Sequence, residues 1–362
     1  MTTTQMVTAT QIRIVELSGK PYNRGFEHGV KLKDSISRLA NMFYSIYSEK
    51  YKLSKEDILR RASKYIPFIE EYSPSIAEEI KGIAEGSEKK LEEIAMIVAY
   101  YEIYDRLAFA LGCTSFAITA NATVDGSTYI GQNWDDDINW YWKGEMPVLL
   151  KERCDPGPNL LAYTYPGIPA AAGINSEGIC LSWNTMHCEE SKVGVPTYVI
   201  LTELLHQKRI GDALGAIMRA DRAESFNFVI GDINGEIYDV EATPSDVDIQ
   251  YSNKHIGHAN NFLSTKLNIK KDLIAANLPD TIIRANRMNK LLDQRYGTFD
   301  LEKTTELLKD HINYPKSICR HPAPGEAFQG VTWDSWVMIP AKREMWLCHG
   351  NPCQNEFRTY MI

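Results

Sequence analysis

Two hydrophobic patterns divide this chain near residue 113. Before that point, apolar residues recur every three or four positions, as in amphipathic helices, and Ile76, Ile80 and Ile83 share one such face. The elements predicted there are a strand at 11–17, a helix that follows residues 22–29 and runs to about residue 50, a helix at 54–71, and helices that begin near residues 74 and 91. Charged residues lie between the apolar positions, and we interpret them as the solvated faces of these helices.

Beyond residue 113, short strand-like runs alternate with turn sequences. Asp125-Gly126 and Asn234-Gly235 are typical of tight turns between antiparallel strands, and Gly178 ends a similar turn. Strands are predicted at 116–119, 127–132, 179–183, 236–241, 254–257, 331–339 and 344–348. Helical pairs are predicted at 198–206 with 211–220 and at 281–292 with 301–311. Antiparallel strands with separate groups of helices indicate an α+β layered fold.

Composition and charge exclude several classes of function. The 362 residues are 44% hydrophobic and 24% charged, which is ordinary for a globular protein, and the net charge is −8. Such a chain lacks the basic surface that binds nucleic acid. No apolar run approaches the length of about 20 residues that spans a bilayer. Residues 1–12 do not resemble a secretory signal, and 359–362 do not resemble a peroxisomal address.

The seven cysteines are scattered and odd in number, which indicates free thiols in a reducing compartment. We therefore expect a cytoplasmic protein. Cys348 and His349 with Cys353 are the one combination that suggests a metal site. No second pair lies at zinc-finger spacing, so neither a metal nor another cofactor is expected.

Gly112-Cys113 has the chemistry of a self-cleavage junction. The Cys113 thiol could attack the carbonyl of Gly112, shift the peptide to a thioester and leave Cys113 at a new N-terminus after hydrolysis. An α-amine titrates near pH ~8 and could then activate the thiol. Glycine tolerates the distorted backbone that such a shift requires. The alternative is that Cys113 is a small buried apolar residue.

Polar residues downstream supply candidate partners for this cysteine. Asp135 follows Asn133 and Trp134 at the end of a predicted strand, where a site could form, although the acidic run 135–137 is equally typical of a solvated turn. The spacing of that run is not that of a calcium loop. Asn260 could stabilise an oxyanion, and Arg320 could clamp a carboxylate or tune a thiol.

A papain-like arrangement is the other reading of the thiol chemistry. His28, His187 or His258 would then act as the general base of a cysteine. No cysteine in the chain carries the local sequence signature of that class.

An ordered series of short motifs resembles one known family along nearly the full length. The series comprises residues 25–29, 79–84, 112–115, 131–135, 175–178, 183–187, 194–196, 258–260 and 314–320. It resembles the acyl-coenzyme A:6-aminopenicillanic acid acyltransferase (isopenicillin N acyltransferase) family of N-terminal nucleophile hydrolases. The resemblance implies a four-layer αββα sandwich with a helical N-terminal segment. It favours Cys113 as a nucleophile over Cys113 as a packing residue.

The same resemblance implies roles for individual residues. Cys113 would be the nucleophile of both self-cleavage and turnover, and Gly112 would carry the carbonyl that is cut. Asp135 would orient the freed amine, Asn260 would stabilise the oxyanion, and Arg320 would lie beside the nucleophile. Ser115 would be a hydroxyl near the thiol, and the expected substrate-binding residues are Asn133, Trp134, Asn184 and Ser317.

Cleavage would convert a zymogen into two chains of one domain. Residues 1–112 would become the α chain and 113–362 the catalytic β chain of a heterodimer, with further oligomers left open. The expected activity is hydrolysis of a small N-acyl amide through a Cys113 acyl-enzyme. The alternative is transfer of an acyl group from acyl-CoA to an amine such as 6-aminopenicillanic acid, with acyl-CoA as co-substrate. The aromatic run 140–142 is expected to line the acyl or amine pocket.

Overall fold

The computed structural model describes residues 11–103, 112–138, 146–267, 270–325 and 329–362. The aromatic run 140–142 lies outside these ranges. Within them, no helix is both long and apolar enough to cross a membrane.

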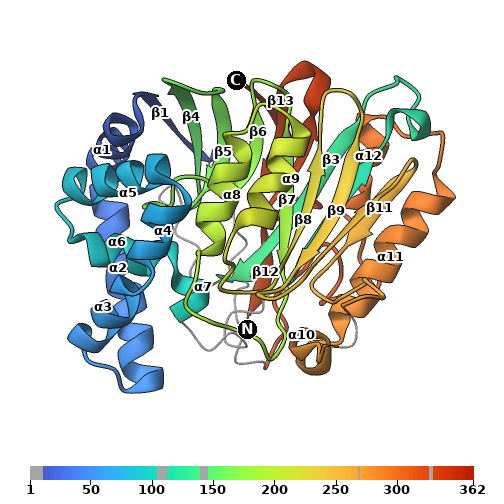
Figure 1. The fold of residues 1–362 in the computed structure, drawn as a ribbon. Coiled ribbons are helices and arrows are strands. Elements are labelled where there is room, and N and C mark those ends of the chain that lie inside the picture. The colour runs from blue at the N-terminus through green and yellow to red at the C-terminus, as the bar shows by residue number, and fades with distance from the viewer. Residues whose placement is uncertain (1–10, 104–111, 139–145, 268–269, 326–328) are drawn as a thin grey trace.

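Two sheets form the centre of the molecule (Figure 1). In the order of the sheet, the eight-stranded sheet consists of β1 (Arg13–Gly19), β4 (Val148–Cys154), β5 (Leu160–Thr164), β6 (Ala172–Asn175), β7 (Cys180–Thr185), β8 (Phe226–Gly231), β9 (Ile237–Ala242) and β10 (Val247–Tyr251). The six-stranded sheet consists of β11 (His255–His258), β2 (Cys113–Ile118), β3 (Tyr129–Asp137), β12 (Gly330–Ile339), β13 (Glu344–His349) and β14 (Arg358–Met361). All pairs are antiparallel except β1 with β4.

The three predicted turns connect neighbouring strands. They join β2 to β3, β6 to β7 and β8 to β9, and all three pairs are antiparallel as expected. Gly126, Gly178 and Gly235 have φ values of 68°, 85° and 88°, a conformation that favours glycine. The turn sequences therefore predicted these hairpins correctly, because local backbone conformation sets them.

The two sheets face each other across a core of aromatic rings and satisfied polar groups. Trp134 of β3 packs edge-on against Trp183 of β7, with ring centroids 5.1 Å apart. The Gln132 amide donates to the Trp183 carbonyl oxygen at 2.7 Å and accepts from the Trp183 N–H at 2.9 Å. Because the oxygen and the nitrogen of the Gln132 amide both have a partner, this amide links the two sheets without an unpaired buried atom of its own.

Helices cover the outer faces of both sheets (Figure 1). On the eight-stranded sheet lie α8 (Thr197–Leu205) and α9 (Ile210–Arg219), with α8 packed on β6 and β7. On the six-stranded sheet lie α11 (Asp280–Gln294), against β2 and β11, and α12 (Leu301–Leu307), against β12, with the short α10 (Leu273–Asn277) before them. The order helix, sheet, sheet, helix confirms the predicted α+β class and its four layers.

The N-terminal segment adds a group of helices beside the sandwich (Figure 1, blue to teal). They are α1 (Pro21–Lys31), α2 (Lys33–Tyr51), α3 (Lys55–Ser63), α4 (Ile66–Tyr72), α5 (Pro74–Gly86), α6 (Leu91–Val98) and α7 (Tyr100–Ile103). The helix predicted to run to about residue 50 corresponds to α2. The single helix predicted at 54–71 is wrong in one respect, because it is divided into α3 and α4, with the break just before Pro67, whose ring cannot continue a preceding helix.

Helices α1 and α5 approach closely through glycines. A Cβ on Gly82 of α5 would lie 2.2 Å from the carbonyl oxygen of Tyr22, and one on Gly25 of α1 would lie 1.9 Å from that of Glu79. Backbone atoms cannot move aside as a flexible side chain can. The glycines of the 25–29 and 79–84 motifs are therefore explained by helix packing.

We predict that Gly82→Ala lowers the free energy of unfolding by about 1–3 kcal/mol, because the added methyl group overlaps backbone. Gly211→Ala is the matched control. Gly211 is also helical, but its added Cβ would meet no atom within 4 Å, so this change should be neutral or slightly stabilising. Chemical denaturation of both variants checks the prediction, and equal effects would contradict it.

Candidate active site

Cys113 is the first residue of β2, between β3 and β11. It pairs across strands with Trp134, and both belong to the hydrophobic core between the sheets. Only 7% of the Cys113 surface is exposed. The Gly112–Cys113 peptide thus lies where a central strand enters the sandwich.

Asn260, two residues after β11, holds the backbone nitrogen of Cys113. Its side-chain oxygen accepts hydrogen bonds from the Cys113 N–H and from Arg284 Nη2, both at 2.9 Å. Its nitrogen donates to the carbonyl oxygen and the hydroxyl of Thr185 at 3.0 and 3.1 Å. Donors on one side and acceptors on the other fix the orientation of the amide. The side-chain nitrogen of Asn260, the expected oxyanion donor, therefore already donates to Thr185 in the continuous chain.

Two buried guanidinium groups lie beside Gly112 and Cys113. Arg284 of α11 donates through Nη1 to the Cys113 carbonyl oxygen at 2.6 Å. Asp280, one turn earlier on α11, accepts from Arg284 Nε at 3.3 Å and from Arg320 Nη1 at 3.1 Å. Burial acts to raise the pKa of Asp280, but Arg284 and Arg320 lower it overall. One carboxylate therefore positions both cations beside Cys113.

Gly112 has no room for a side chain between these cations. A Cβ at this position would lie 2.4 Å from Arg284 Nη2 and 2.8 Å from Arg320 Nη1. Both guanidinium groups are fixed by Asp280, so neither can move freely to make space. The glycine before the cysteine is therefore required by packing as well as suited to cleavage.

Asp135 of β3 has one engaged oxygen and one free oxygen. The Thr332 hydroxyl donates to Oδ1 at 2.7 Å, whereas Oδ2 has no hydrogen-bond partner among the described residues. Burial raises the pKa of Asp135 to about 7, although Arg284 and Arg320 act to lower it. A carboxyl group that titrates near neutrality can both accept and release a proton at physiological pH.

The Cys113 thiol is a weak acid in the continuous chain. Burial, and next the carboxylate of Asp135, raise its pKa to about 12, while a hydrogen bond from the Asp135 backbone N–H acts in the opposite direction. The thiolate is the nucleophilic form of cysteine. Attack by Cys113 at neutral pH therefore needs a base nearby.

The acidic run 135–137 is not a solvated turn. Asp135, Asp136 and Asp137 are all buried in β3. The Tyr165 hydroxyl donates to Asp136 Oδ2 at 2.8 Å and accepts from Trp134 Nε1 at 2.8 Å. Burial also raises the pKa of Asp136 to about 7. The interpretation of this run as a solvated turn is wrong because β3 continues through it, paired with β12.

The remaining predicted site residues lie in two places: Ser115 and Asn184 between the sheets, and Asn133 and Ser317 near the Arg320 segment. Ser115, two positions after Cys113, donates to Asn184 Oδ1 of β7 across the sandwich. Asn133 faces the opposite side of β3 from Trp134, and its amide donates to the carbonyl oxygens of Leu308 and Ile318, each at 2.8 Å. Ser317 donates to the Cys319 carbonyl oxygen at 2.6 Å. Asn133 and Ser317 therefore hold the backbone near Arg320 and do not face Cys113.

The three histidines of the papain-like alternative contact other groups. His28 accepts from the Gly167 N–H at 2.9 Å, and burial lowers its pKa to about 3. His258 Nε2 lies 3.0 Å from Glu241, and His187 Nδ1 lies 3.9 Å from Glu224. None of these contacts involves Cys113, so the geometry does not favour a papain-like pair.

Asp280, Arg284 and Thr332 were missed in the sequence. The spacing of Asp280 and Arg284 is that of an ordinary exposed ion pair on a helix. Their position on the same helical face as Thr281, Ala285 and Met288 was the available signal, because that face is buried. None of the three groups of metal-binding residue types in the described ranges includes Cys113.

The family model described as acyl-coenzyme A:6-aminopenicillanic acid acyl-transferase matches residues 122–354. This is more than half of the chain, and the chain belongs to this family, as the sequence motifs predicted. The matched range includes Asp135, Asn260 and Arg320 and begins after Cys113. The family is one of acyl-transfer enzymes, and the expectation that the protein is an enzyme is confirmed.

Individual proteins resemble the chain to different degrees. The chain is 27% identical over 354 residues to the 40 kDa form of acyl-coenzyme A:6-aminopenicillanic-acid-acyltransferase from Emericella nidulans, covering 96% of this chain and 95% of that protein. An uncharacterized protein from Archaeoglobus fulgidus is 19% identical, and the match covers 83% of this chain and 58% of that protein. A conjugated bile acid hydrolase from Clostridium perfringens superposes with a TM-score of 0.45 at 15% identity, covering 69% of this chain and 97% of that chain. A penicillin V acylase from Agrobacterium tumefaciens superposes with a TM-score of 0.41 at 9% identity, covering 66% of this chain and 82% of that chain.

We predict that Arg284→Met lowers the free energy of unfolding by about 3 kcal/mol, because it removes one partner of a buried ion pair. Arg287→Met, on the same helix, is the control. Its pair with Asp310 is partly exposed and should contribute about 1 kcal/mol or less. Chemical denaturation distinguishes the two, and an equal loss would show that burial does not set the cost.

Proposed function

We propose that this protein is a self-processing cysteine amidohydrolase that cuts its own chain between Gly112 and Cys113 and then hydrolyses a small N-acyl amide. The observation that carries the proposal is the surroundings of that peptide. Asn260 binds its nitrogen, Arg284 binds the next carbonyl oxygen, and the Asp135 carboxylate, which has a free oxygen, acts on the pKa of the thiol. A buried packing cysteine needs none of these groups.

Self-processing would begin with transfer of the Cys113 proton to Asp135. The sulfur would add to the Gly112 carbonyl carbon, and the C–N bond would break as Asp135 returns the proton to the Cys113 nitrogen. The resulting thioester would be opened by water, which gives the Gly112 carboxylate, the free thiol and the α-amine. Asn260 supports this step, because its oxygen already accepts from the nitrogen that becomes the amine.

Turnover would use the new α-amine as the base. An amine with a pKa near ~8 can take the thiol proton at neutral pH, whereas the thiol alone is mostly protonated. The thiolate would attack the substrate amide, the leaving amine would take the proton from the α-ammonium, and water would release the acid. If Asn260 donates to the oxyanion, its nitrogen must exchange Thr185 for the substrate oxygen.

Both chains would remain together after cleavage, as an α/β heterodimer. Strand β1, from the N-terminal segment, pairs with β4 along its whole length, and one hydrophobic core contains residues from both sides of Gly112. Cleavage at a strand entrance removes none of these contacts.

Acyl transfer from acyl-CoA to an amine is the second candidate. The similarity to the Emericella nidulans acyltransferase over nearly the full length favours it. The same nucleophile would form the same acyl-enzyme, and an amine in place of water would take the acyl group. The two functions therefore differ only in whether water or an amine takes the acyl group.

We predict that Cys113→Ala yields one full-length, inactive chain, because alanine can neither cleave nor attack. The wild-type protein should give two masses, for 112 and 250 residues, in intact mass spectrometry under denaturing conditions. Cys180→Ala, which removes a buried thiol from β7, is the control and should still be processed. Cleavage of the Cys113→Ala chain after Gly112 would disprove the mechanism.

We predict that processing accelerates with rising pH up to about 7, because Asp135 must be ionised to accept the thiol proton. Below that pKa the rate should fall about tenfold per pH unit. Slow processing of a Cys113→Ser chain, followed by electrophoresis, makes the rate measurable. Asp135→Asn should abolish processing, whereas Asp136→Asn should retain it, although the pKa of Asp136 is also about 7. The reverse result would assign the base to Asp136.

Product analysis separates hydrolysis from transfer. The mature protein is given an acyl-CoA with and without a candidate amine, and a set of N-acyl amides is tested in parallel. Hydrolysis of an amide, with free acid as the product in both acyl-CoA reactions, supports the amidohydrolase. Formation of a new amide at the expense of free acid would establish the transferase instead.

A further inference from the structure

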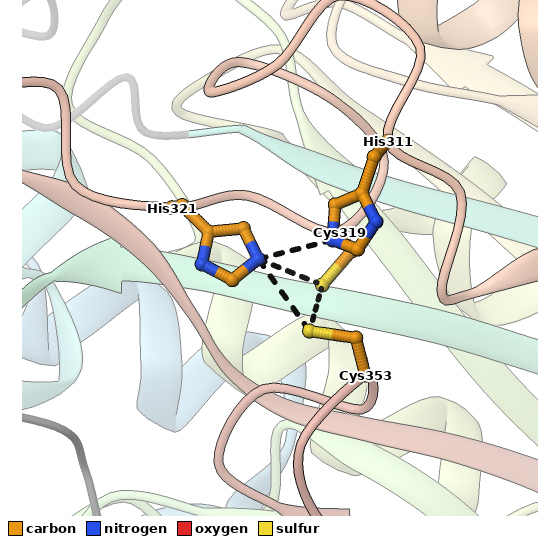
Figure 2. A group of neighbouring side chains, drawn as sticks. All are labelled: His311, Cys319, His321 and Cys353. Carbon is orange, nitrogen blue, oxygen red and sulfur yellow. Dashed lines mark hydrogen bonds between the residues drawn. The ribbon is translucent and has the colours of Figure 1, made fainter.

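Four side chains with metal-binding atoms converge next to Arg320 (Figure 2). Cys319 and His321 flank Arg320 in the chain, His311 follows α12, and Cys353 lies in the loop after β13. Their sulfur and imidazole nitrogen atoms all lie within 4.8 Å of one another. Figure 2 shows the four side chains pointing toward one common centre.

The spacing of these atoms is that of a tetrahedral zinc site. The two sulfurs are 3.6 Å apart, His321 Nε2 lies 3.6 Å from Cys319 Sγ and 3.5 Å from Cys353 Sγ, and the two imidazole Nε2 atoms are 3.1 Å apart. Zinc bond lengths of about 2.3 Å to sulfur and about 2.0–2.1 Å to nitrogen place tetrahedral ligands about 3.8, 3.6 and 3.3 Å apart for these three types of pair. We propose that His311, Cys319, His321 and Cys353 bind a structural zinc ion.

The ligand types favour zinc over other common ions. Two thiolates and two neutral imidazoles suit a borderline-soft cation, whereas calcium and magnesium require oxygen ligands. On binding, both thiols would lose their protons to solvent, and the site would be electrically neutral. The Asn351 amide also donates to Cys319 Sγ at 3.7 Å, as an outer partner of a metal-bound thiolate does.

Two other groups of metal-binding residue types in the described chain already form ion pairs with protein groups. Near Glu152, Cys154 and His206, the Arg24 guanidinium lies 3.1 Å from Glu152 and 3.2 Å from His206 and supplies the positive charge. In the group of Asp239, Glu241 and His258, both imidazole nitrogens of His258 already have hydrogen-bond partners. Nδ1 pairs with the Ala259 carbonyl oxygen, and Nε2 pairs with Glu241. Neither has the tetrahedral N and S set of the cluster at Cys319.

The proposed ion would fix the backbone around Arg320. Metal bonds at residues 319 and 321 would tie this segment to the loop of Cys353, where the Asn351 amide already donates to the Arg320 carbonyl oxygen at 2.8 Å. The Arg320 N–H donates to the Thr332 hydroxyl, which in turn donates to Asp135. With four protein ligands the ion has no open position, so its role would be structural.

Metal analysis tests the proposal. The full chain is purified with a reductant, loaded with Zn²⁺ and freed of excess metal, and zinc is measured by mass spectrometry. We expect one zinc per chain, and, with Co²⁺ in its place, the absorption of a tetrahedral cobalt thiolate. His311→Ala and Cys353→Ser, at partly exposed positions, should weaken zinc binding by more than the about 10–100-fold that loss of an outer-shell partner costs.

The matched control is Cys348→Ser, a thiol five positions from Cys353 that donates to the Gly350 carbonyl oxygen and is outside the cluster. It should retain one zinc. Failure of the reduced wild-type protein to hold zinc, or equal zinc content in Cys353→Ser and Cys348→Ser, would overturn the proposal. A disulfide between Cys319 and Cys353 in a reduced, zinc-loaded sample would overturn it as well.

Discussion

The buried charge cluster around Asp280 is the constraint on which the arrangement at Cys113 depends. Two guanidinium groups lie inside the protein, where an unpaired charge is very costly. Asp280 accepts from both, so the α11 helix and the segment before β12 are held at a fixed distance from the start of β2. The peptide at Gly112 must fit between these cations, and the carboxyl of Asp135 keeps a pKa near neutrality because their attraction only partly offsets its burial. The positions of the groups around Gly112 and the pKa of Asp135 therefore both depend on the same two buried cations.

The six-stranded sheet transmits this constraint to the segment that carries Arg320. Asn133 of β3 binds the carbonyl oxygens of Leu308 and Ile318, and Thr332 of β12 bridges the Arg320 N–H and Asp135. Each of these buried groups is satisfied by a partner from another element, which favours one arrangement over others. A residue that resembles a substrate contact in the sequence can therefore be a support for the site.

The sequence predicted the hairpins through turn glycines and apolar periods, which are local signals, and the four layers through the family motifs. It missed what depends on contacts between distant elements. Asp280 and Arg284 have the spacing of a surface pair, and only the packing of α11 shows that they are buried. The alternation of β3 could have separated Asn133 from Trp134, since neighbouring strand residues face opposite sides. His311, Cys319, His321 and Cys353 share no metal-binding spacing, so their convergence could not be anticipated. The sequence suggested Cys348 and His349 with Cys353; of these only Cys353 belongs to the cluster, and His349 pairs with Asp334.

The parallel edge strand β1 affects how the protein can refold after its chain has been cleaved. It belongs to the N-terminal segment, yet it completes a sheet whose other seven strands come after Cys113. A continuous chain folds as one body at any dilution. A chain severed at Gly112 would have to find its missing strand by collision, so its recovery after denaturation would depend on concentration. After cleavage, refolding would therefore require two chains to associate, whereas the uncut chain can refold alone.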